Sequence, residues 1–362
     1  MDYCLIHLSD FHLRASTQLE TDEVLKSLTG DIKHRIQELG LPDPHVALSG
    51  DLAYGGREEE YSIVDGFVEG LKEALRARRM AYCGGNHDVN WSLLAQFNAE
   101  LMNDMVEKRG GVAGAEARFG SDSDREALRN GMGPYYSFLE KHGLKSTGDL
   151  FYVDSVDVAD VKLNYISLNS AYIFSRKYNY HGYVGLRQML AAGKAVANPD
   201  RPSFNITLVH HPLEAIVPSA QEETKRQLFS FSDIILNGHV HSPRVSVEYT
   251  ARMLGRSRPG PPPVISCARC VFDEANDPTV TSGYSIIGLD FEYEKVRSVK
   301  VWEVQFDKAK RQWYHDESKG TYPMTVGVAT GTENSMSSDQ VGHKVTDSER
   351  ALLGKWKQTG KG

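Results

Sequence analysis

Five short polar motifs, each directly after an apolar run, constrain the fold of this chain more than any other feature. In order they are Asp10-Phe-His12, Gly50-Asp51, Gly85-Asn-His-Asp88, His210-His-Pro212 and Gly238-His-Val-His241. Short apolar runs bounded by polar residues are typical of buried strands. Loops beyond the carboxyl ends of strands line the ligand crevice of open α/β sheets. Motifs that are distant in the sequence are therefore expected to meet at one place.

The stretches between the motifs predict alternating strands and helices. Buried strands are expected at Tyr3–Leu8, Val46–Ser49 and Met80–Cys83, with helically spaced apolar residues in Glu20–Leu39 and Glu58–Arg79. This alternation favours an α/β sheet covered by helices. Later helices are expected at Trp91–Val106, Tyr183–Ala197 and Gln221–Phe229. Later strands are expected at Leu150–Asp154, Val161–Leu168, Phe204–Val209, Ile234–Leu236, Val245–Tyr249, Val264–Ser266, Tyr284–Tyr293 and Val296–Phe306.

Two segments differ in composition from the predicted core. Residues 109–133 combine glycines with a polar stretch and are expected to form an inserted loop or lid. Beyond about Thr325 the chain is rich in Gly, Ser, Thr and charged residues, so 325–362 is expected to be a disordered tail. Residues 1–324 are therefore predicted to form one domain.

Charge and cysteine content limit the class of protein. The net charge of −7 over 362 residues argues against a general polyanion-coating protein, so any nucleic-acid contact must be a local basic patch. Four cysteines are sparse, which suits a reducing cytoplasm. No signal-peptide pattern and no apolar run long enough for a membrane span are present. We therefore expect a cytoplasmic protein with no membrane partner, and its oligomeric state stays open.

The motifs supply carboxylate, imidazole and amide groups but no thiolate. This set suits Mn, Fe or Zn rather than a structural, sulfur-rich zinc site. Seven side chains are too many for one open tetrahedral site and suit two divalent metal ions. Asp51 is the natural bridge, because the two oxygens of a carboxylate can bind two metals. The candidate ligands are Asp10, His12, Asp51, Asn86, His210, His239 and His241.

The ordered set of motifs resembles that of the calcineurin-like metallophosphoesterases over roughly residues 3–310. The resemblance implies a four-layer sandwich of two mixed β-sheets flanked by helices, with a dinuclear metal site at the strand ends. It also implies how the ligands divide between the metals. One set is Asp10, His12, Asp51 and His241, and the other is Asp51, Asn86, His210 and His239.

The mechanism expected of such a site follows from charge. Two metals about 3.5–4 Å apart can clamp a phosphoryl group and acidify a bridging water, whose hydroxide would attack phosphorus in line. The leaving oxygen then needs a proton. His87 adjoins Asn86, so its ring can face the substrate, and its ordinary pKa of about 6.5 suits a general acid. The family resemblance implies the same role for His87, and Asp51 and His87 are the predicted catalytic residues.

One position departs from the family pattern. The nuclease and cyclic-nucleotide branches often read Gly-Asp-x-x-Asp, where the later Asp orients the catalytic histidine, but here Tyr54 holds that place. Purple acid phosphatases carry a tyrosine there that ligates ferric iron, yet they lack the histidine that His12 supplies. Tyr54 is therefore expected beside the metals, as a candidate substrate contact. Asp88 is a candidate substitute for orienting His87.

Three further residues are candidate substrate contacts. His181 lies in an aromatic segment, 178–183, that resembles part of the class III cyclic-nucleotide phosphodiesterases and could stack on a base; a polar loop with core tyrosines explains it equally well. His211 adjoins His210, and the resemblance implies that His210 rather than His211 is the metal ligand. Arg244 begins a local excess of arginines that could bind phosphates beyond the scissile one, although a solvated face is an equal explanation.

The sequence thus predicts a dinuclear metal-dependent phosphoesterase, with a nucleotide or nucleic-acid phosphodiester as the expected substrate. Gly-Asn-His-Asp, rather than Gly-Asn-His-Glu, favours the diesterase branches. A phosphomonoesterase of protein or small molecules is the first alternative. A catalytically silent scaffold with the same fold is the second, and it is disfavoured because no ligand is missing.

Overall fold

The computed structural model describes most of the chain as far as Tyr314. Its described residues are 1–14, 16, 18–94, 116–117, 120–158, 160–171, 181–197, 203–240, 244–247, 264–268, 271, 282–292, 295–307, 310 and 312–314. The chain divides into two units, Met1–Val328 and Ala329–Gly362, and every described residue belongs to the first. The predicted tail, 325–362, lies outside the described residues.

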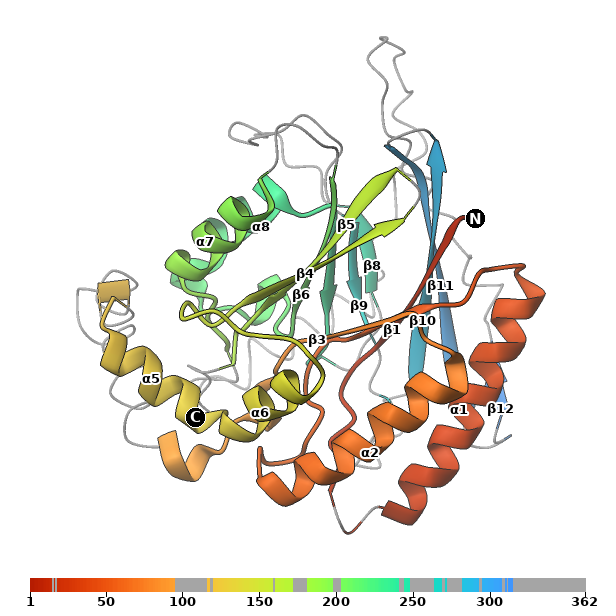
Figure 1. Cartoon of the computed structure of the whole chain (residues 1–362), viewed down its shortest axis with the longest axis horizontal. Coiled ribbons are helices and arrows are strands. Elements are labelled where there is room, and N and C mark those ends of the chain that lie inside the picture. The colour runs from red at the N-terminus through yellow and green to blue at the C-terminus, as the bar shows by residue number, and fades with distance from the viewer. Residues whose placement is uncertain are drawn as a thin grey trace, which may run out of the picture. The chain divides into compact units, whose positions relative to one another are not determined.

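Two sheets form the core of this unit, and both are mixed (Figure 1). The first has the order β12-β11-β10-β1-β2-β3, in which β1, β2 and β3 run parallel and β10 is antiparallel to β1. Its strands are β1 (Tyr3–Leu8), β2 (His45–Leu48), β3 (Arg79–Tyr82), β10 (Gly283–Glu292), β11 (Lys295–Asp307) and β12 (Gln312–Tyr314).

The second sheet has the order β4-β5-β6-β7-β9-β8. Its four central strands run parallel, and both edge strands are antiparallel to their neighbours. Its strands are β4 (Tyr152–Val158), β5 (Val161–Leu168), β6 (Ser203–Val209), β7 (Ile234–Asn237), β8 (Arg244–Val247) and β9 (Val264–Cys267).

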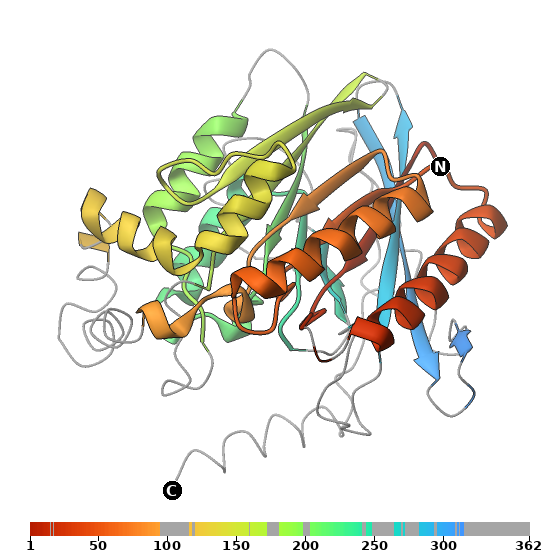
Figure 2. The ribbon, with the colours of Figure 1, turned by 60° about the horizontal axis from the view of Figure 1, so that its bottom comes forward.

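Helices cover the outer face of each sheet (Figure 2). Beside the first sheet, α1 (Gln18–Glu38) packs on α2 (Glu58–Leu75), and α6 (Gly133–Lys141) packs on α2 and on α5 (Asp122–Gly131). Beside the second, α7 (Leu186–Val196) packs on α8 (Gln221–Phe231) and on β4 and β5. None of the helices in the described residues combines the length and apolar character needed to cross a bilayer.

The side chains of β1 show why these layers form. Tyr3 and Leu5 belong to an apolar cluster that draws on both sheets, whereas Cys4 and Ile6 belong to the cluster beneath the helices. Both faces of this strand are buried, so nearly all of its residues are apolar. This is typical of parallel strands that lie between two layers. The predicted four-layer sandwich of two mixed β-sheets flanked by helices is confirmed.

One helix ends earlier than expected, one strand was not predicted, and one predicted helix is described only in part. The second predicted helix ends at Leu75 rather than Arg79, because Arg76 turns into the left-handed region at φ 52° and β3 begins at Arg79. The three-residue strand β12 was not predicted. Only the first four residues of the helix predicted from Trp91 are described, and they are helical.

The segment 109–133 was predicted to be a loop or lid, and for its later part this is wrong. Asp122–Gly131 is the helix α5, whose first turn is capped by the Ser121 hydroxyl accepting from the Asp124 amide at 3.4 Å. Leu128 on this helix is buried. Of residues 109–121, only 116–117 and 120–121 are described.

Candidate metal centre

The predicted ligands follow the parallel strands of both sheets. Asp10 and His12 follow β1, Asp51 follows β2, and Asn86 lies in a short 3₁₀ turn, Asn86–Asp88, after β3. In the second sheet, His210 follows β6 and His239 follows β7. Main-chain hydrogen bonds join these loops, including the Asp10 amide to the Gly50 carbonyl at 3.0 Å and the Gly238 amide to the His210 carbonyl at 2.9 Å. The motifs therefore meet, as the strand-end argument predicted.

The backbone at the ligands is strained. Six non-glycine residues in the described part of the chain have a positive φ, and four of these are predicted ligands. Their φ values are 57° for Asp10, 48° for His12, 52° for Asp51 and 71° for His239. The left-handed region is uncommon for residues other than glycine, although Asp and His enter it more readily than most, and residues held there cluster at functional sites. The strain indicates that this junction of loops is built for a purpose other than stability.

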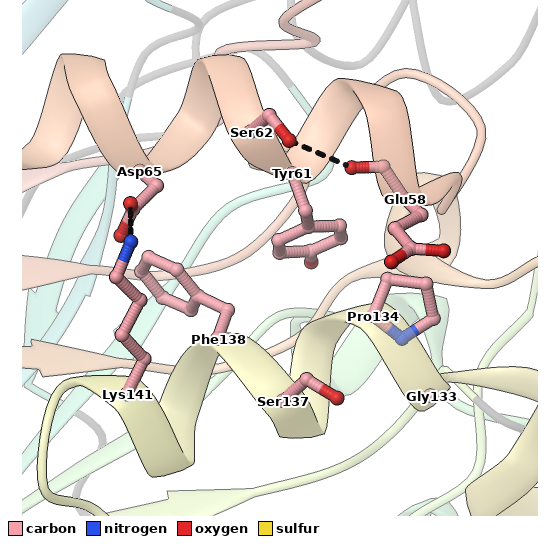
Figure 3. A pocket seen from close by; sticks show the side chains of 9 residues that line it. All are labelled: Glu58, Tyr61, Ser62, Asp65, Gly133, Pro134, Ser137, Phe138 and Lys141. Carbon is pink, nitrogen blue, oxygen red and sulfur yellow. Dashed lines mark hydrogen bonds and ion pairs between the residues drawn. The ribbon is translucent and has the colours of Figure 1, made fainter.

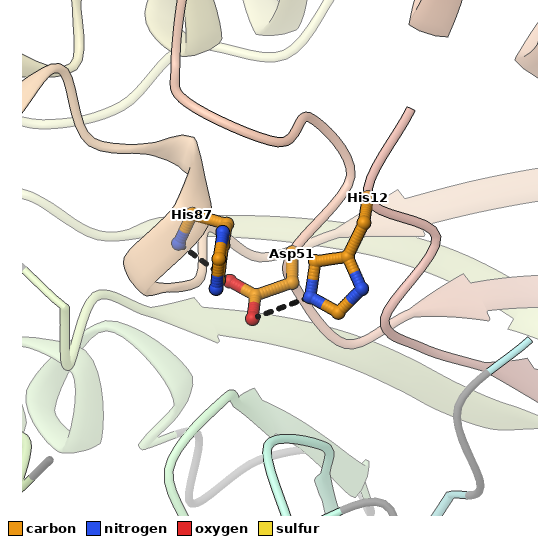
Figure 4. A group of neighbouring side chains, drawn as sticks. All are labelled: His12, Asp51 and His87. Atoms are coloured by element: carbon orange, nitrogen blue, oxygen red, sulfur yellow. Dashed lines mark hydrogen bonds and ion pairs between the residues drawn. The ribbon is translucent and has the colours of Figure 1, made fainter. Parts of the chain in front are cut away.

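Asp51 stands at the centre of the cluster (Figure 4). Its Oδ2 lies 3.3 Å from His12 Nε2 and 3.2 Å from His210 Nε2, while its Oδ1 accepts the His87 amide at 2.8 Å. Burial alone would raise the pKa of Asp51, but the nearby His210 and His87 hold it well below its usual range. One ionised carboxylate thus reaches imidazoles from both sheets, the placement that a bridging ligand needs.

The other predicted ligands surround this carboxylate. The Asp10 carboxylate accepts the His239 amide at 3.2 Å, and His239 Nδ1 lies 3.0 Å from Asn86 Oδ1. Among the described residues, potential ligand atoms gather in two groups, each with all atoms within 4.8 Å of one another. One group is His12, Asp51 and His87, and the other is Asp10, Asp51 and His210. Asp51 belongs to both groups.

The surroundings of His210 show whether these residues could bind a cation. Its Nδ1 lies 2.8 Å from the Ser49 carbonyl, which sets the ring so that Nε2 faces the cluster. Nε2 is buried and lies 3.2 Å from Asp51 Oδ2. It makes no well-aligned hydrogen bond to any of the described residues. Burial would lower the pKa of His210, yet Asp51 raises it to about 9, so a proton and a cation compete for this nitrogen. The donor set therefore fits a divalent metal ion.

Two motif glycines are required by close approach to the ligands. A Cβ on Gly85 would lie 2.2 Å from Asp51 Oδ1, and a Cβ on Gly238 would lie 2.7 Å from Asp10 Oδ2. Both distances are far shorter than any real contact of a Cβ atom. Another residue at Gly85 would therefore displace Asp51, and one at Gly238 would displace Ser9 and Asp10.

His87 is oriented by a main-chain group. Its Nδ1 lies 2.7 Å from the carbonyl oxygen of Tyr54, so Nδ1–H donates and Nε2 is the nitrogen left to meet a substrate. Its half-buried ring lies 4.6 Å from that of His12 and 5.5 Å from that of Tyr54. The suggestion that Asp88 orients His87 is wrong, because the Asp88 carboxylate faces other partners.

Asp88 joins the two loops that carry Asp51 and His87. Its carboxylate accepts the amides of Leu52 at 3.2 Å, Ala53 at 2.8 Å and Gly85 at 2.8 Å. It also accepts the Tyr61 hydroxyl at 2.8 Å. Burial and the charge of Asp51 raise the pKa of Asp88 to about 6. Asp88 therefore holds the two loops together through hydrogen bonds and is not expected to contact the substrate.

Tyr61 links the Asp88 carboxylate to the helices outside the sheet. It projects from α2 toward α6 and lines a cleft of about 630 Å³ between them (Figure 3). The cleft is lined by Glu58, Tyr61, Ser62, Asp65, Gly133, Pro134, Ser137, Phe138 and Lys141, and by no predicted metal ligand. The cleft is therefore not the expected substrate site.

Removing the hydrogen bonds to the Asp88 carboxylate should destabilise the protein. We expect Asp88→Ala to lower the free energy of unfolding by about 3 kcal/mol, because three buried amides lose their acceptor. Tyr61→Phe should cost about 1.5 kcal/mol, the contribution of one hydrogen bond to a charged group. Urea unfolding at pH 8, where Asp88 is ionised, measures both. Tyr314→Phe, on an exposed ring, is the matched control, and an Asp88→Ala variant as stable as wild type would contradict the assignment.

The structure places the remaining candidates as follows. His211 is buried, with Nδ1 2.8 Å from the Ser170 hydroxyl and its ring 4.4 Å from that of His239. Burial and its histidine neighbours hold the pKa of His211 well below its usual range, so the ring is neutral. His181 is half-buried. Arg244 begins β8, and nothing further is described of its side chain. His241 lies outside the described residues.

Sequence reasoning missed Arg14. Its guanidinium carbon lies 4.5 Å from the centre of the Tyr54 ring. The only signal in the sequence is its position two residues after His12, because the contact depends on how two loops align.

A family model described as "Calcineurin-like phosphoesterase" matches residues 5–243. A search of curated proteins gives no match.

Similar solved structures show low sequence identity. A single mutant of Vps29 from Entamoeba histolytica is 11% identical with a TM-score of 0.32, over 86% of this chain and 97% of that one. The sulfate thiohydrolase SoxB from Thermus thermophilus, in complex with glycerol, is 13% identical with a TM-score of 0.41, over 83% and 56%. The NAD nucleotidase NadN from Haemophilus influenzae is 11% identical with a TM-score of 0.34, over 99% and 60%.

The family match carries the identification. It covers more than half of the chain, and all five motifs, from Asp10 to His241, lie within it. The chain therefore belongs to the calcineurin-like phosphoesterases.

Proposed function

We propose that this chain is a dinuclear metal-dependent phosphodiesterase that hydrolyses a phosphodiester of a nucleotide or nucleic acid. The observation that carries the proposal is the position of Asp51. Its single carboxylate lies between His12 and His210 and belongs to both groups of ligand atoms. Two metal ions that share a bridging carboxylate form the arrangement that in-line phosphoryl displacement uses.

The residues would divide between the two ions as the family resemblance implies. Asp10, His12, Asp51 and His241 would hold one, and Asp51, Asn86, His210 and His239 the other. When bound, a pair of Mn, Fe or Zn ions supplies the charge that polarises a phosphoryl group and acidifies water.

The chain's own groups supply the remaining chemistry. His87 holds a proton at Nε2 for the leaving oxygen, because Nδ1 is committed to the Tyr54 carbonyl. The Asp51 carboxylate accepts the His87 amide, so the proton donor and the central ligand keep a fixed relation. Asp88 adds the amides of Leu52 and Ala53 to the same frame. The site is thus organised before a substrate arrives.

A panel of substrates tests the proposed substrate class. Metal-loaded protein should hydrolyse bis(p-nitrophenyl) phosphate with a higher kcat/KM than p-nitrophenyl phosphate, and should cleave single-stranded DNA or a cyclic nucleotide. A reversed ratio, with release of phosphate from a phosphopeptide, would favour the phosphomonoesterase. No hydrolysis of any ester by protein that holds two ions would favour the silent scaffold.

A visible spectrum of the iron-loaded protein also distinguishes the phosphodiesterase from the phosphomonoesterase, because it reports whether Tyr54 binds iron. We expect no phenolate-to-iron charge-transfer band in the oxidised, iron-loaded protein, because His12 supplies the ligand that purple acid phosphatases lack. The Tyr54 ring instead lies 4.5 Å from the guanidinium carbon of Arg14 and 5.5 Å from the His87 ring. Visible spectra of wild type and Tyr54→Phe check this, and metal content should match. A band that disappears in Tyr54→Phe would overturn the assignment and favour the phosphomonoesterase.

A further inference from the structure

Three imidazole rings meet where the second sheet reaches the metal centre. The centre of the His210 ring lies 5.3 Å from that of His239, and the His211 ring lies 5.1 Å from His210 and 4.4 Å from His239. The two pairs that include His210 have interplanar angles of 84° and 74°, the edge-to-face arrangement that aromatic rings favour. His210 and His239 are predicted ligands, and His211 is the third member of the group.

His211 is enclosed by two other segments of the second-sheet layer. Its exposed fraction is 1%, so the ring offers almost no surface to a substrate. The Ser170 hydroxyl, in the loop after β5, lies 2.8 Å from His211 Nδ1 and accepts the His211 amide at 3.2 Å. Gly182 lies so close to the ring that a Cβ there would approach within 2.5 Å. A hydrogen bond and close packing therefore hold the His211 ring in place.

Main-chain hydrogen bonds fix the segments that enclose His211. The Ser170 carbonyl accepts the Tyr183 amide at 3.0 Å, and the Gly182 amide donates to the Ala215 carbonyl at 2.7 Å. Gly182 and Ile216 also form an isolated β-bridge. The surroundings of His211 are thus part of the hydrogen-bonded frame of the fold, and its ring joins that frame to the predicted ligands.

The His239 ring needs such support. His239 has a φ of 71°, and a residue in the left-handed region persists only where its surroundings over-determine it. Its Nδ1 lies 3.0 Å from Asn86 Oδ1, which is itself a predicted ligand atom. The His210 ring, in contrast, is oriented through Nδ1 by the Ser49 carbonyl. Packing of His211 against His239 limits the positions that the His239 ring can take.

We propose that His211 is a positioning residue: held by Ser170, it fixes the His210 and His239 rings relative to each other so that both bind one metal ion. This inference rests on the proposed function, in which the family resemblance assigns these two histidines to the same ion, here called the His210–His239 ion. The affinity of that ion depends on His211, although His211 is not a ligand. The other ion, held through His12 and His241, does not depend on it.

Manganese binding to the full chain tests this role without any substrate. Equilibrium dialysis of metal-free protein against rising Mn²⁺ gives the number of bound ions and a dissociation constant for each. Wild type should bind two ions. His211→Ala should raise one dissociation constant about 10–100-fold, the range typical of groups that orient metal ligands, and leave the other unchanged. Ser170→Ala should raise the same constant by less, because the ring remains but loses its anchor.

Two ligand variants show which ion His211 serves. In His12→Ala, which removes a ligand of the other ion, adding His211→Ala should still weaken the His210–His239 ion about 10–100-fold. In His239→Ala, the ion that remains is the other one, and adding His211→Ala should leave its dissociation constant unchanged, because the ring that His211 positions is absent. Equal losses in the two backgrounds would contradict the assigned role.

Ser232→Ala is the matched control for Ser170→Ala. Both serines are buried, and the Ser232 hydroxyl also bonds a side chain, with its oxygen 2.7 Å from that of the Thr207 hydroxyl. Urea unfolding of the metal-free proteins should show similar losses of stability in the two variants. Only Ser170→Ala should also weaken Mn²⁺ binding. Equal Mn²⁺ affinities in the two variants would show that Ser170 is merely structural and would overturn its part in the proposal.

The outcomes distinguish this inference from the proposed function. If His211→Ala binds both ions as tightly as wild type, the positioning role is wrong while the dinuclear phosphodiesterase stands. If His211→Ala loses one ion completely, as removal of a ligand would, His211 is itself a ligand and the positioning role is again wrong. If wild type binds fewer than two ions at saturating Mn²⁺, the proposed function fails and the inference fails with it.

Discussion

Asp51→Asn should lower kcat/KM by about a thousandfold or more, because several kcal/mol of charge stabilisation is lost with the metals. Asp51 is buried, and one of its oxygens lies within 3.3 Å of His12 Nε2 and 3.2 Å of His210 Nε2. An amide of the same size can still accept the His87 amide, so the fold should persist. It carries no charge and presents only one oxygen, so it cannot bridge two cations.

Metal content and kinetics measured together check this expectation. Asp51→Asn should hold clearly fewer ions per chain than wild type. Asp65→Asn is the matched control, because Asp65 lies on α2 and pairs with Lys141 and His142, away from the ligands. An Asp51→Asn protein with wild-type metal content and rate would contradict the assigned bridge.

His87→Ala should keep both metals and lose rate mainly on substrates with poor leaving groups. Loss of a general acid typically costs about 10²–10⁴-fold, and a leaving group as good as p-nitrophenolate needs less protonation. The ring is half-buried, and its Nδ1 is held by the Tyr54 carbonyl. A series of aryl esters with rising leaving-group pKa should therefore give a steeper dependence of rate in the variant.

The competing role for His87 is that of a metal ligand. A ligand atom of His87 lies within 4.8 Å of those of His12 and Asp51. Equal losses on good and poor leaving groups, together with loss of an ion, would show that His87 is a ligand. His34→Ala, on an exposed position of α1, controls for the loss of an imidazole alone.

The strand framework was predictable because its signal is local. The strand predicted at Tyr3–Leu8 is β1 to the residue, since both faces of this strand are buried and all of its residues except His7 are apolar. The same reasoning located the polar motifs at the carboxyl ends of parallel strands. It therefore brought Asp10, Asp51 and His210 together, although up to 200 residues separate them.

Features that depend on loop register or on main-chain groups could not be predicted from local sequence patterns. The partner of His87 is the carbonyl of Tyr54, an atom that every residue type supplies, so the search among side chains pointed to Asp88. The contact of Arg14 with Tyr54 requires that two loops pair at Leu13 and Ala53. In the segment 109–133, frequent glycines hid the capped helix α5, whose Leu128 is buried by tertiary packing.

Hydrolysis by this chain is proposed to need two metal ions held around Asp51. The most direct test removes all metal with a chelator and returns Mn²⁺ stepwise while the hydrolysis of bis(p-nitrophenyl) phosphate is followed. We expect no hydrolysis in the metal-free protein and a rise in rate that reaches its plateau at two ions per chain. Full activity in the chelated protein, or a plateau at one ion, would contradict it.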